Sequence, residues 1–108
     1  MNQNPRYTHV SCEWVRAQLE TSADLVVLDV RTLGEFVSYH IPQALLHPID
    51  VLSSTCDQFD RNSRIILICE HGIRSEMAAR WLAGQGFSDV STMDGGMAEY
   101  EGEVIYGE

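Results

Sequence analysis

The chain contains no lysine, and its seven basic residues, all arginine, face 16 aspartate and glutamate residues. The formal net charge is therefore −9 at pH 7. Binding to nucleic acid depends on neutralising phosphates with lysine and arginine, and binding to an anionic membrane surface depends on the same residues. We therefore expect neither nucleic acid nor a membrane as a partner. An anionic substrate would meet a repulsive long-range field, so its site must supply local donors.

The sequence also lacks a long apolar segment and a paired-cysteine motif. No stretch reaches the length of a transmembrane helix, and the N-terminal sequence contains no signal-peptide core. The three cysteines, Cys12, Cys56 and Cys69, form no CxxC pair, so neither a disulfide framework nor a zinc knuckle is predicted. His9 and His47 have no companion at ligand spacing. We expect a cytoplasmic protein without a metal or cofactor.

The length and composition are those of one small α/β domain. The 108 residues have a mass of 12.1 kDa, and 44% of them are apolar, which suits a single core and gives one expected domain over residues 1–108. Apolar runs predict strands at 25–28, 44–46, 65–68 and 90–93. Between them, helices are predicted at 11–19, 32–39, 50–59 and 75–85, with breaks at residues 21–24 and Gly86. Ser11, Thr32 and Ser75 are the expected N-caps, and Trp14 and Trp81 are expected on buried helix stripes.

Buried strands that alternate with helices predict a parallel sheet covered on both faces. In such folds ligands bind beyond the carboxyl ends of the strands. Asp29-Val30-Arg31 follows one predicted strand and Cys69 follows another. The functional site is therefore expected at this edge of the sheet.

The segment from Cys69 to Ser75 joins a buried strand directly to a helix, and Cys69 is its one strong nucleophile. The start of a helix, with its free N–H groups, favours a thiolate. Gly72 allows successive N–H groups to face inward, and Arg74 supplies a positive charge. Ser75 is expected either to cap the helix or to donate to a bound sulfur. The alternative is a cysteine that merely ends a strand, beside an arginine in a surface loop.

Loop length separates two anion chemistries. Four residues lie between Cys69 and Arg74, whereas tyrosine phosphatases use a longer loop and require a general-acid aspartate. The shorter loop suits one additional sulfur atom better than a tetrahedral phosphate. A small cysteine phosphatase or arsenate reductase therefore stays a disfavoured alternative.

Taken in order, several segments resemble the rhodanese-like sulfurtransferase family. The matching segments are Leu28-Asp29-Val30-Arg31, Glu35-Phe36, His40-Ile41-Pro42 with Ala44, Cys69-x-x-Gly72-x-Arg74-Ser75, Ala78-Ala79, Leu82, Gly86-Phe87, Val90 and Asp94-Gly95-Gly96. The resemblance covers about residues 8–100. Three positions depart from the family pattern: Tyr39 and Gln43 replace usual glycines, and Met97 replaces a frequent aromatic residue.

The resemblance implies a three-layer rhodanese-like fold, with a central parallel sheet of five strands flanked by helices. It also implies that Cys69 accepts a sulfane sulfur from a donor, becomes a persulfide, and passes the sulfur to a thiol or cyanide. In that mechanism the backbone of Glu70, His71, Gly72, Ile73, Arg74 and Ser75 forms a cradle for the sulfur. The expected partners are a small sulfur donor, or a protein that carries a persulfide, and a thiol acceptor.

The roles of several neighbouring residues stay open at the sequence level. Glu70 and His71 occupy positions that influence donor choice in the family, where forms specialised for thiosulfate carry basic residues. Here one residue is acidic and the other is neutral at pH 7, so a protein or small-molecule persulfide is the expected donor, with thiosulfate as a weaker one. Each is alternatively a solvated loop residue, although a charged His71 would stabilise the thiolate. Asp29 and Arg31 either contribute to substrate binding or are structural, with Arg31 paired to Glu35 at i,i+4.

The function itself has two interpretations of different class. The first is an enzyme that turns over a sulfur donor through Cys69. The second is a sulfur-carrier or protein-interaction module that relays sulfur to a partner with little free turnover. Either Cys12 or Cys56 could resolve a persulfide, or both are ordinary packed or surface cysteines, and His40 is expected to hydrogen-bond locally.

Overall fold

The computed structural model describes residues 6–22 and 24–108. Its strands are β1 (Thr8–Val10), β2 (Leu25–Asp29), β3 (Leu45–Leu46), β4 (Arg64–Ile68) and β5 (Asp89–Met93). Its helices are α1 (Cys12–Thr21), α2 (Leu33–Ser38), α3 (Leu52–Thr55) and α4 (Ile73–Gly84). Short 3₁₀ turns, η1 (Ile49–Val51) and η2 (Cys56–Gln58), flank α3, so the helix expected at 50–59 is three short pieces.

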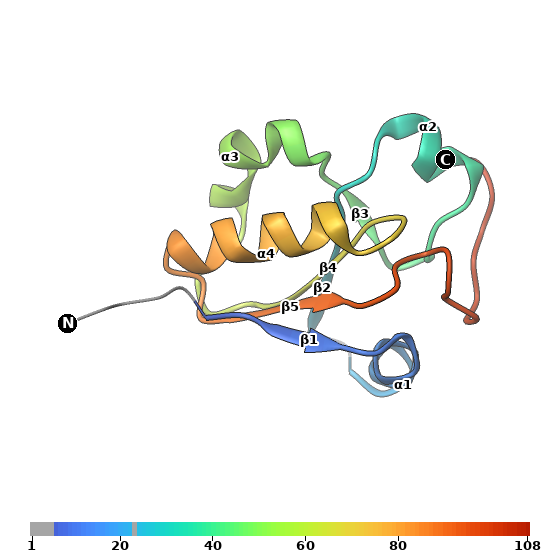
Figure 1. Cartoon of the computed structure of the whole chain (residues 1–108), viewed down its shortest axis with the longest axis horizontal. Coiled ribbons are helices and arrows are strands. Elements are labelled where there is room, and N and C mark those ends of the chain that lie inside the picture. The colour runs from blue at the N-terminus through green and yellow to red at the C-terminus, as the bar shows by residue number, and fades with distance from the viewer. Residues whose placement is uncertain (1–5, 23) are drawn as a thin grey trace.

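The five strands form one sheet in the order β1-β5-β4-β2-β3, and every neighbouring pair is parallel. Helix α1 lies on one face of the sheet, and α3 and α4 lie on the other (Figure 1). The expected three-layer fold with a five-stranded parallel sheet is confirmed. Because β4 is the central strand, the residue that follows it, Cys69, lies in the middle of the carboxyl edge.

Alternate residues of the central strands feed two separate cores. Leu28, Ile65 and Leu67 pack in the cluster under α3 and α4, whereas Val27 and Ile66 pack in the cluster that contains Val15 of α1. Strands buried on both faces read as continuous apolar runs, which is why β2 and β4 were readable from the sequence. These two rigid strands hold the carboxyl-edge loops in place.

The N-caps of the first two helices are confirmed, but that of α4 is not. The side chains of Ser11 and Thr32 accept the N–H of Trp14 and of Glu35, respectively. Helix α4 begins two residues earlier than predicted, at Ile73, with Gly72 as its N-cap at φ 96°. Ser75 therefore lies inside the first turn. The sulfur of Cys69 accepts N–H groups at this helix start, so a side-chain cap is not needed.

The end of α4 follows the sequence pattern. Gly86 adopts φ 95°, its N–H donates to the Ala83 carbonyl, and the Phe87 N–H donates to Leu82. This is the Schellman arrangement, in which a left-handed residue just past the helix satisfies its last carbonyls.

Three further expectations need correction. The strand β1 was not predicted, because its three residues are largely exposed at the sheet edge and lack an apolar run. Trp14 and Trp81 are 38% and 36% exposed, so neither belongs to the core. Thr21 still belongs to α1; of the expected break at 21–24, Ala23 lies outside the described residues. In the described part of the chain, no helix is long and apolar enough to cross a membrane.

Candidate active site

Cys69 lies at the junction between β4 and the loop that enters α4, and it is 1% exposed. Its Sγ accepts the backbone N–H of Gly72 at 3.1 Å and that of Ser75 at 3.2 Å. Two N–H dipoles directed at one sulfur stabilise negative charge on it. Of the residues predicted to form a cradle, Gly72 and Ser75 are thus the two whose N–H groups contact the sulfur.

The left-handed conformation of Gly72 makes this geometry possible. At φ 96° its N–H turns back toward Cys69 while the next residue enters α4. The positive end of the 12-residue helix α4 thus begins beside the sulfur. Its first residues, Ile73 and Arg74, have no intrahelical acceptor for their N–H groups, as at any helix N-terminus. A second negatively charged sulfur on Cys69 would meet a favourable field here.

Ser75 links the sulfur to the central sheet. Its side chain is fully buried, with Oγ 3.4 Å from Cys69 Sγ and 2.8 Å from Oγ1 of Thr92 on β5. Its Oγ also donates to the Gly72 carbonyl at 3.2 Å. Ser75 therefore positions the cradle, and it does not cap the helix.

Residues after β5 support the cradle from its other side. The N–H groups of Met97 and Ala98 donate to the carbonyls of Cys69 and Glu70 at 2.8 and 2.9 Å. Gly96, at φ 65°, packs so closely that a Cβ there would lie 2.6 Å from the Cys69 carbonyl oxygen. A glycine is thus required at this position, because a side chain would displace the backbone of Cys69 and Glu70.

We expect Gly96→Ala to lower any activity that depends on Cys69 by about 100-fold, because a shift of about 1 Å in a reacting group costs that much. Gly86→Ala is the matched control: Gly86 also has a positive φ, yet a Cβ there meets nothing within 4 Å. Both variants bear a strain of about 1–2 kcal/mol. Measuring activity and the thermal unfolding midpoint of both variants separates the effect of backbone strain, which they share, from displacement of Cys69, which only Gly96→Ala causes. Equal losses of activity in the two variants would contradict this role of Gly96.

Arg31 is fully buried and forms an ion pair with Asp29, not with Glu35. Its Nε and Nη2 donate to the two carboxylate oxygens of Asp29 at 3.0 and 2.8 Å, and both side chains are 0% exposed. The predicted Arg31–Glu35 pair is therefore wrong. The i,i+4 rule applies within a helix, and α2 begins only at Leu33, so Arg31 lies outside it.

Glu70 turns inward toward this pair. Its carboxylate accepts Arg31 Nη1 at 3.2 Å and the Tyr39 hydroxyl at 3.2 Å, and its side chain is 26% exposed. Burial, and next the charge of Glu70, raise the pKa of Tyr39, so this phenol stays a donor. Glu70 is thus not the solvated carboxylate that one interpretation expected. Through these contacts Glu70, the residue next to Cys69, is linked to Arg31, which follows β2, and to Tyr39, which follows α2.

Arg74 is held by Glu35 at the start of α2. Its two Nη atoms each donate to a different carboxylate oxygen at 2.8 Å, and both side chains are about one-third exposed. The same carboxylate accepts the Thr32 N–H and so completes a capping box. The hydrogen bond from Arg74, foremost, lowers the pKa of Glu35 to about 2. The positive charge expected from Arg74 is therefore present but compensated.

The Glu35–Arg74 pair predicts a pH-dependent part of the stability. The Glu35 pKa is lowered on folding, from 4.5 to about 2, so its contribution is complete above about pH 4.5 and is lost toward pH 2. For partly exposed groups we expect about 1 kcal/mol. The difference in unfolding free energy between the wild type and Glu35→Gln, measured by urea titration, should shrink over this pH range. A constant difference would contradict the assignment.

The remaining cradle residues, His71 and Ile73, lie at the surface. Ile73, with 71% of its surface accessible, starts an apolar stripe along α4 that continues through Met77 and Trp81. His40 hydrogen-bonds to the Phe36 carbonyl at 2.7 Å, as expected. In residues 6–22 and 24–108, no group of three or more His, Cys, Asp or Glu side chains is arranged to hold a metal ion.

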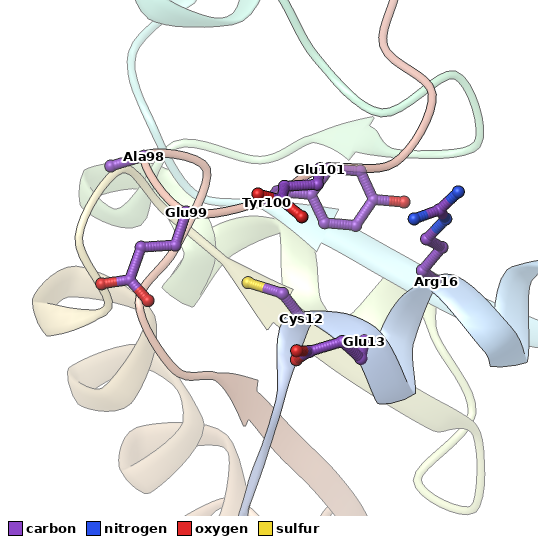
Figure 2. A pocket seen from close by; sticks show the side chains of 7 residues that line it. All are labelled: Cys12, Glu13, Arg16, Ala98, Glu99, Tyr100 and Glu101. Atoms are coloured by element: carbon purple, nitrogen blue, oxygen red, sulfur yellow. The ribbon is translucent and has the colours of Figure 1, made fainter.

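The thiols of Cys12 and Cys56 donate to backbone carbonyls, whereas the sulfur of Cys69 accepts backbone N–H groups. Cys12 lines a groove of about 410 Å³ between α1 and residues 98–101 (Figure 2) and packs against the α1-side core, whereas Cys69 belongs to the other core. Burial, followed by the charges of Glu99 and Glu13, raises the pKa of the Cys12 thiol. Burial likewise raises the pKa of Cys56, which is 3% exposed. A raised pKa leaves less of each cysteine in the reactive thiolate form.

Sequence reasoning missed three contributors to this site: Glu35 as the partner of Arg74, Thr92 behind Ser75, and Tyr39 beside Glu70. Tyr39 was visible only as a departure from a family glycine. The pairing of Glu35 with Arg74 could have been inferred from the predicted topology, because α2 and α4 both begin at the carboxyl edge of the sheet. Thr92 gave no signal, since its strand reads as ordinary core.

Comparison with known proteins identifies the family and several relatives of this chain. The family described as "Rhodanese-like domain" matches residues 11–103. "Putative sulfur carrier protein YrkF" of Bacillus subtilis is 33% identical over 95 residues, covering 88% of this chain; the chain spans about half (51%) of that relative. Thiosulfate sulfurtransferase GlpE of Pseudomonas savastanoi is 34% identical over 96 residues, covering 85% of this chain and 91% of that protein. A rhodanese-like domain protein from Staphylococcus aureus superposes with a TM-score of 0.85 at 25% identity, covering 94% and 99% of the two chains.

Proposed function

Because the chain belongs to the rhodanese-like domain family, we propose that it transfers a sulfane sulfur through a persulfide on Cys69. The observation that carries this proposal is the sulfur of Cys69 held by the N–H groups of Gly72 and Ser75 at the start of α4. Relatives named as thiosulfate sulfurtransferases support sulfur transfer as the general chemistry.

The proposed reaction has two steps, each balanced in atoms and charge. With thiosulfate, the Cys69 thiolate attacks the outer sulfur, the S–S bond breaks, and sulfite leaves with the electron pair. Cys69 then carries a persulfide anion. Cyanide or a thiolate attacks its terminal sulfur, and the Cys69 thiolate is released. A covalent intermediate of this kind divides one difficult transfer into two easier ones.

The cradle can stabilise both states of the cysteine. Before transfer, the N–H groups of Gly72 and Ser75 hold the thiolate. After transfer, the negative charge lies one atom farther out, where the positive end of α4 and the free N–H groups of its first turn are available. No metal or cofactor takes part in either step.

A second candidate is a sulfur carrier that passes the sulfur only to a protein partner. Two observations favour it: one relative carries that name, and the exposed stripe of Ile73, Met77 and Trp81 begins in the cradle itself. A partner protein that reaches Cys69 would have to cover Ile73. The same Cys69 persulfide serves both functions.

Steady-state formation of thiocyanate, from cyanide and either thiosulfate or an alkyl hydropersulfide, tests the enzyme proposal. Many turnovers per protein are expected of an enzyme. A single equivalent of sulfur that loads onto Cys69 but does not turn over would favour the carrier. Product formation that continues unchanged after Cys69 is replaced would contradict both.

A further inference from the structure

The ionic groups around Cys69 leave no free positive charge among them. Arg31 is paired with Asp29 and Glu70, and Arg74 is paired with Glu35. These five side chains, two guanidinium groups and three carboxylates, carry one negative charge in excess. An anionic donor therefore depends mainly on backbone N–H groups and on the α4 dipole, and not on an uncompensated arginine.

Of the two arginines, Arg74 is the one whose charge matters to the nucleophile. It lies on the first turn of α4, and its pKa is raised mainly by the hydrogen bonds that it donates to Glu35, with a lesser contribution from the charge of Cys69. Arg74 directly precedes Ser75, whose N–H donates to the Cys69 sulfur at 3.2 Å, so Arg74 belongs to the same helix turn that holds the sulfur. The bidentate contact with Glu35, at 2.8 Å to each oxygen, compensates the charge of Arg74 there.

Glu35 is fixed in place by more than its contact with Arg74. Its Oε1 accepts the Thr32 N–H at 2.9 Å and the Thr32 hydroxyl at 3.2 Å, while its own N–H donates to Thr32. The carboxylate is therefore preorganised at the N-terminus of α2, and its pKa of about 2 keeps it charged near neutral pH. Arg74 cannot turn toward a donor without leaving this partner.

The charge that the cradle must hold differs greatly between donors. With thiosulfate, the thiolate and the dianion bring three negative charges together, and three leave as persulfide anion and sulfite. With an alkyl hydropersulfide, the electrophile is the neutral R–S–SH form: the Cys69 thiolate attacks the outer sulfur, the S–S bond breaks, and the departing alkyl thiolate takes up the proton of the outer sulfur. Cys69 then carries the persulfide anion, so one negative charge is present throughout. A compensated Arg74 penalises the first reaction much more than the second.

We propose that Glu35, through Arg74, selects against dianionic sulfur donors and in favour of hydropersulfides. This inference rests on the proposed function of Cys69 and specifies its donor class. Glu35 itself touches neither Cys69 nor the reacting sulfur; it acts by controlling the charge of its partner.

Glu35→Gln tests the inference with little structural change, because the glutamine amide oxygen can still accept the Thr32 N–H. The measured quantity is the rate of sulfur loading onto Cys69 in a single turnover, from thiosulfate and from a neutral alkyl hydropersulfide. We expect the ratio of thiosulfate to hydropersulfide loading to rise about tenfold. The rise should shrink with added salt, since it comes from an uncompensated charge. Structural damage would slow both donors and would not produce a gain.

Two further variants complete a double-mutant cycle of Glu35 and Arg74. Arg74→Gln leaves Glu35 unpaired and should lower the same ratio by a similar factor. The double variant Glu35→Gln/Arg74→Gln should return close to the wild-type ratio. The matched control is Asp57→Asn, which also breaks an arginine–carboxylate pair, with Arg61. Arg61 also contacts the Gln85 carbonyl, so this pair lies at the opposite end of α4, and the ratio should stay within about twofold of wild type.

The outcomes are distinguishable. If both donors load Cys69 and the ratio is the same in the wild type, Glu35→Gln and Arg74→Gln, the selectivity role is overturned while the proposed function stands. If Asp57→Asn raises the ratio as much as Glu35→Gln, net charge is responsible and the specific role of Glu35 is overturned. If neither donor places sulfur on Cys69, both proposals fail together.

Discussion

Replacing Cys69 with serine is expected to lower the rate of sulfur transfer by more than about 1000-fold, as loss of a nucleophile does in other covalent enzymes. A serine hydroxyl is a much weaker nucleophile near neutral pH and cannot form a persulfide. The fold should be retained, because the serine oxygen can accept the same N–H groups of Gly72 and Ser75. The measurement is thiocyanate formation together with the thermal unfolding midpoint.

Cys12→Ser is the control for this substitution. Cys12 is half-buried and packs with the α1-side core, and its thiol donates to the Asp94 and Gly96 carbonyls. A serine hydroxyl can keep these contacts, so Cys12→Ser should leave thiocyanate formation within about twofold of wild type. If Cys12→Ser stopped release of sulfur from a loaded Cys69, Cys12 would be a resolving thiol. If Cys69→Ser kept full activity, the proposed nucleophile would be wrong.

Replacing Arg31 with methionine is expected to destabilise the fold by about 3–5 kcal/mol, because it strands the buried carboxylate of Asp29. Arg31 and Asp29 are both 0% exposed, and Arg31 also donates to the Tyr39 carbonyl at 2.7 Å. Few single substitutions on a chain of this size should cost as much. Urea titration of the variant gives the loss directly.

Two other variants define the cause of that loss. Arg64→Met removes an arginine whose carboxylate partners, Asp24 and Asp89, are exposed and 3.8–3.9 Å away, so it should cost no more than about 1 kcal/mol. The double variant Asp29→Asn/Arg31→Met removes the stranded charge and should recover part of the stability. Equal losses for Arg31→Met and Arg64→Met would contradict a buried ion pair as the source of the effect.

The architecture and the place of Cys69 between β4 and α4 were predictable from the sequence, because each depends on short-range patterns. Continuous apolar runs identify β2 and β4, and a cysteine directly between such a strand and a helix identifies the candidate site. The edge strand β1 escaped prediction, since Thr8–Val10 pairs only with β5 and is mostly exposed. A strand of this kind is formed by its neighbour more than by its own composition.

The ion pairs were not predictable, because they depend on which loops the fold brings together. Sequence spacing favoured Arg31 with Glu35, yet the structure joins Arg31 to Asp29 and Glu70, and Glu35 to Arg74. Arg74 is 39 residues from Glu35 in the chain. The same limit applies to Gly96, whose close contact with the cradle is visible only once β5 lies beside β4.

The central claim, that Cys69 carries the transferred sulfur, is tested most directly by the intact mass of the reduced protein after brief exposure to each donor. Peptide mapping then locates any added mass, and a cyanide chase removes a sulfane sulfur. We predict a gain of one sulfur atom on the peptide that contains Cys69, larger with the hydropersulfide than with thiosulfate and lost on addition of cyanide. No gain with either donor, or a gain confined to Cys12 or Cys56, would contradict the account.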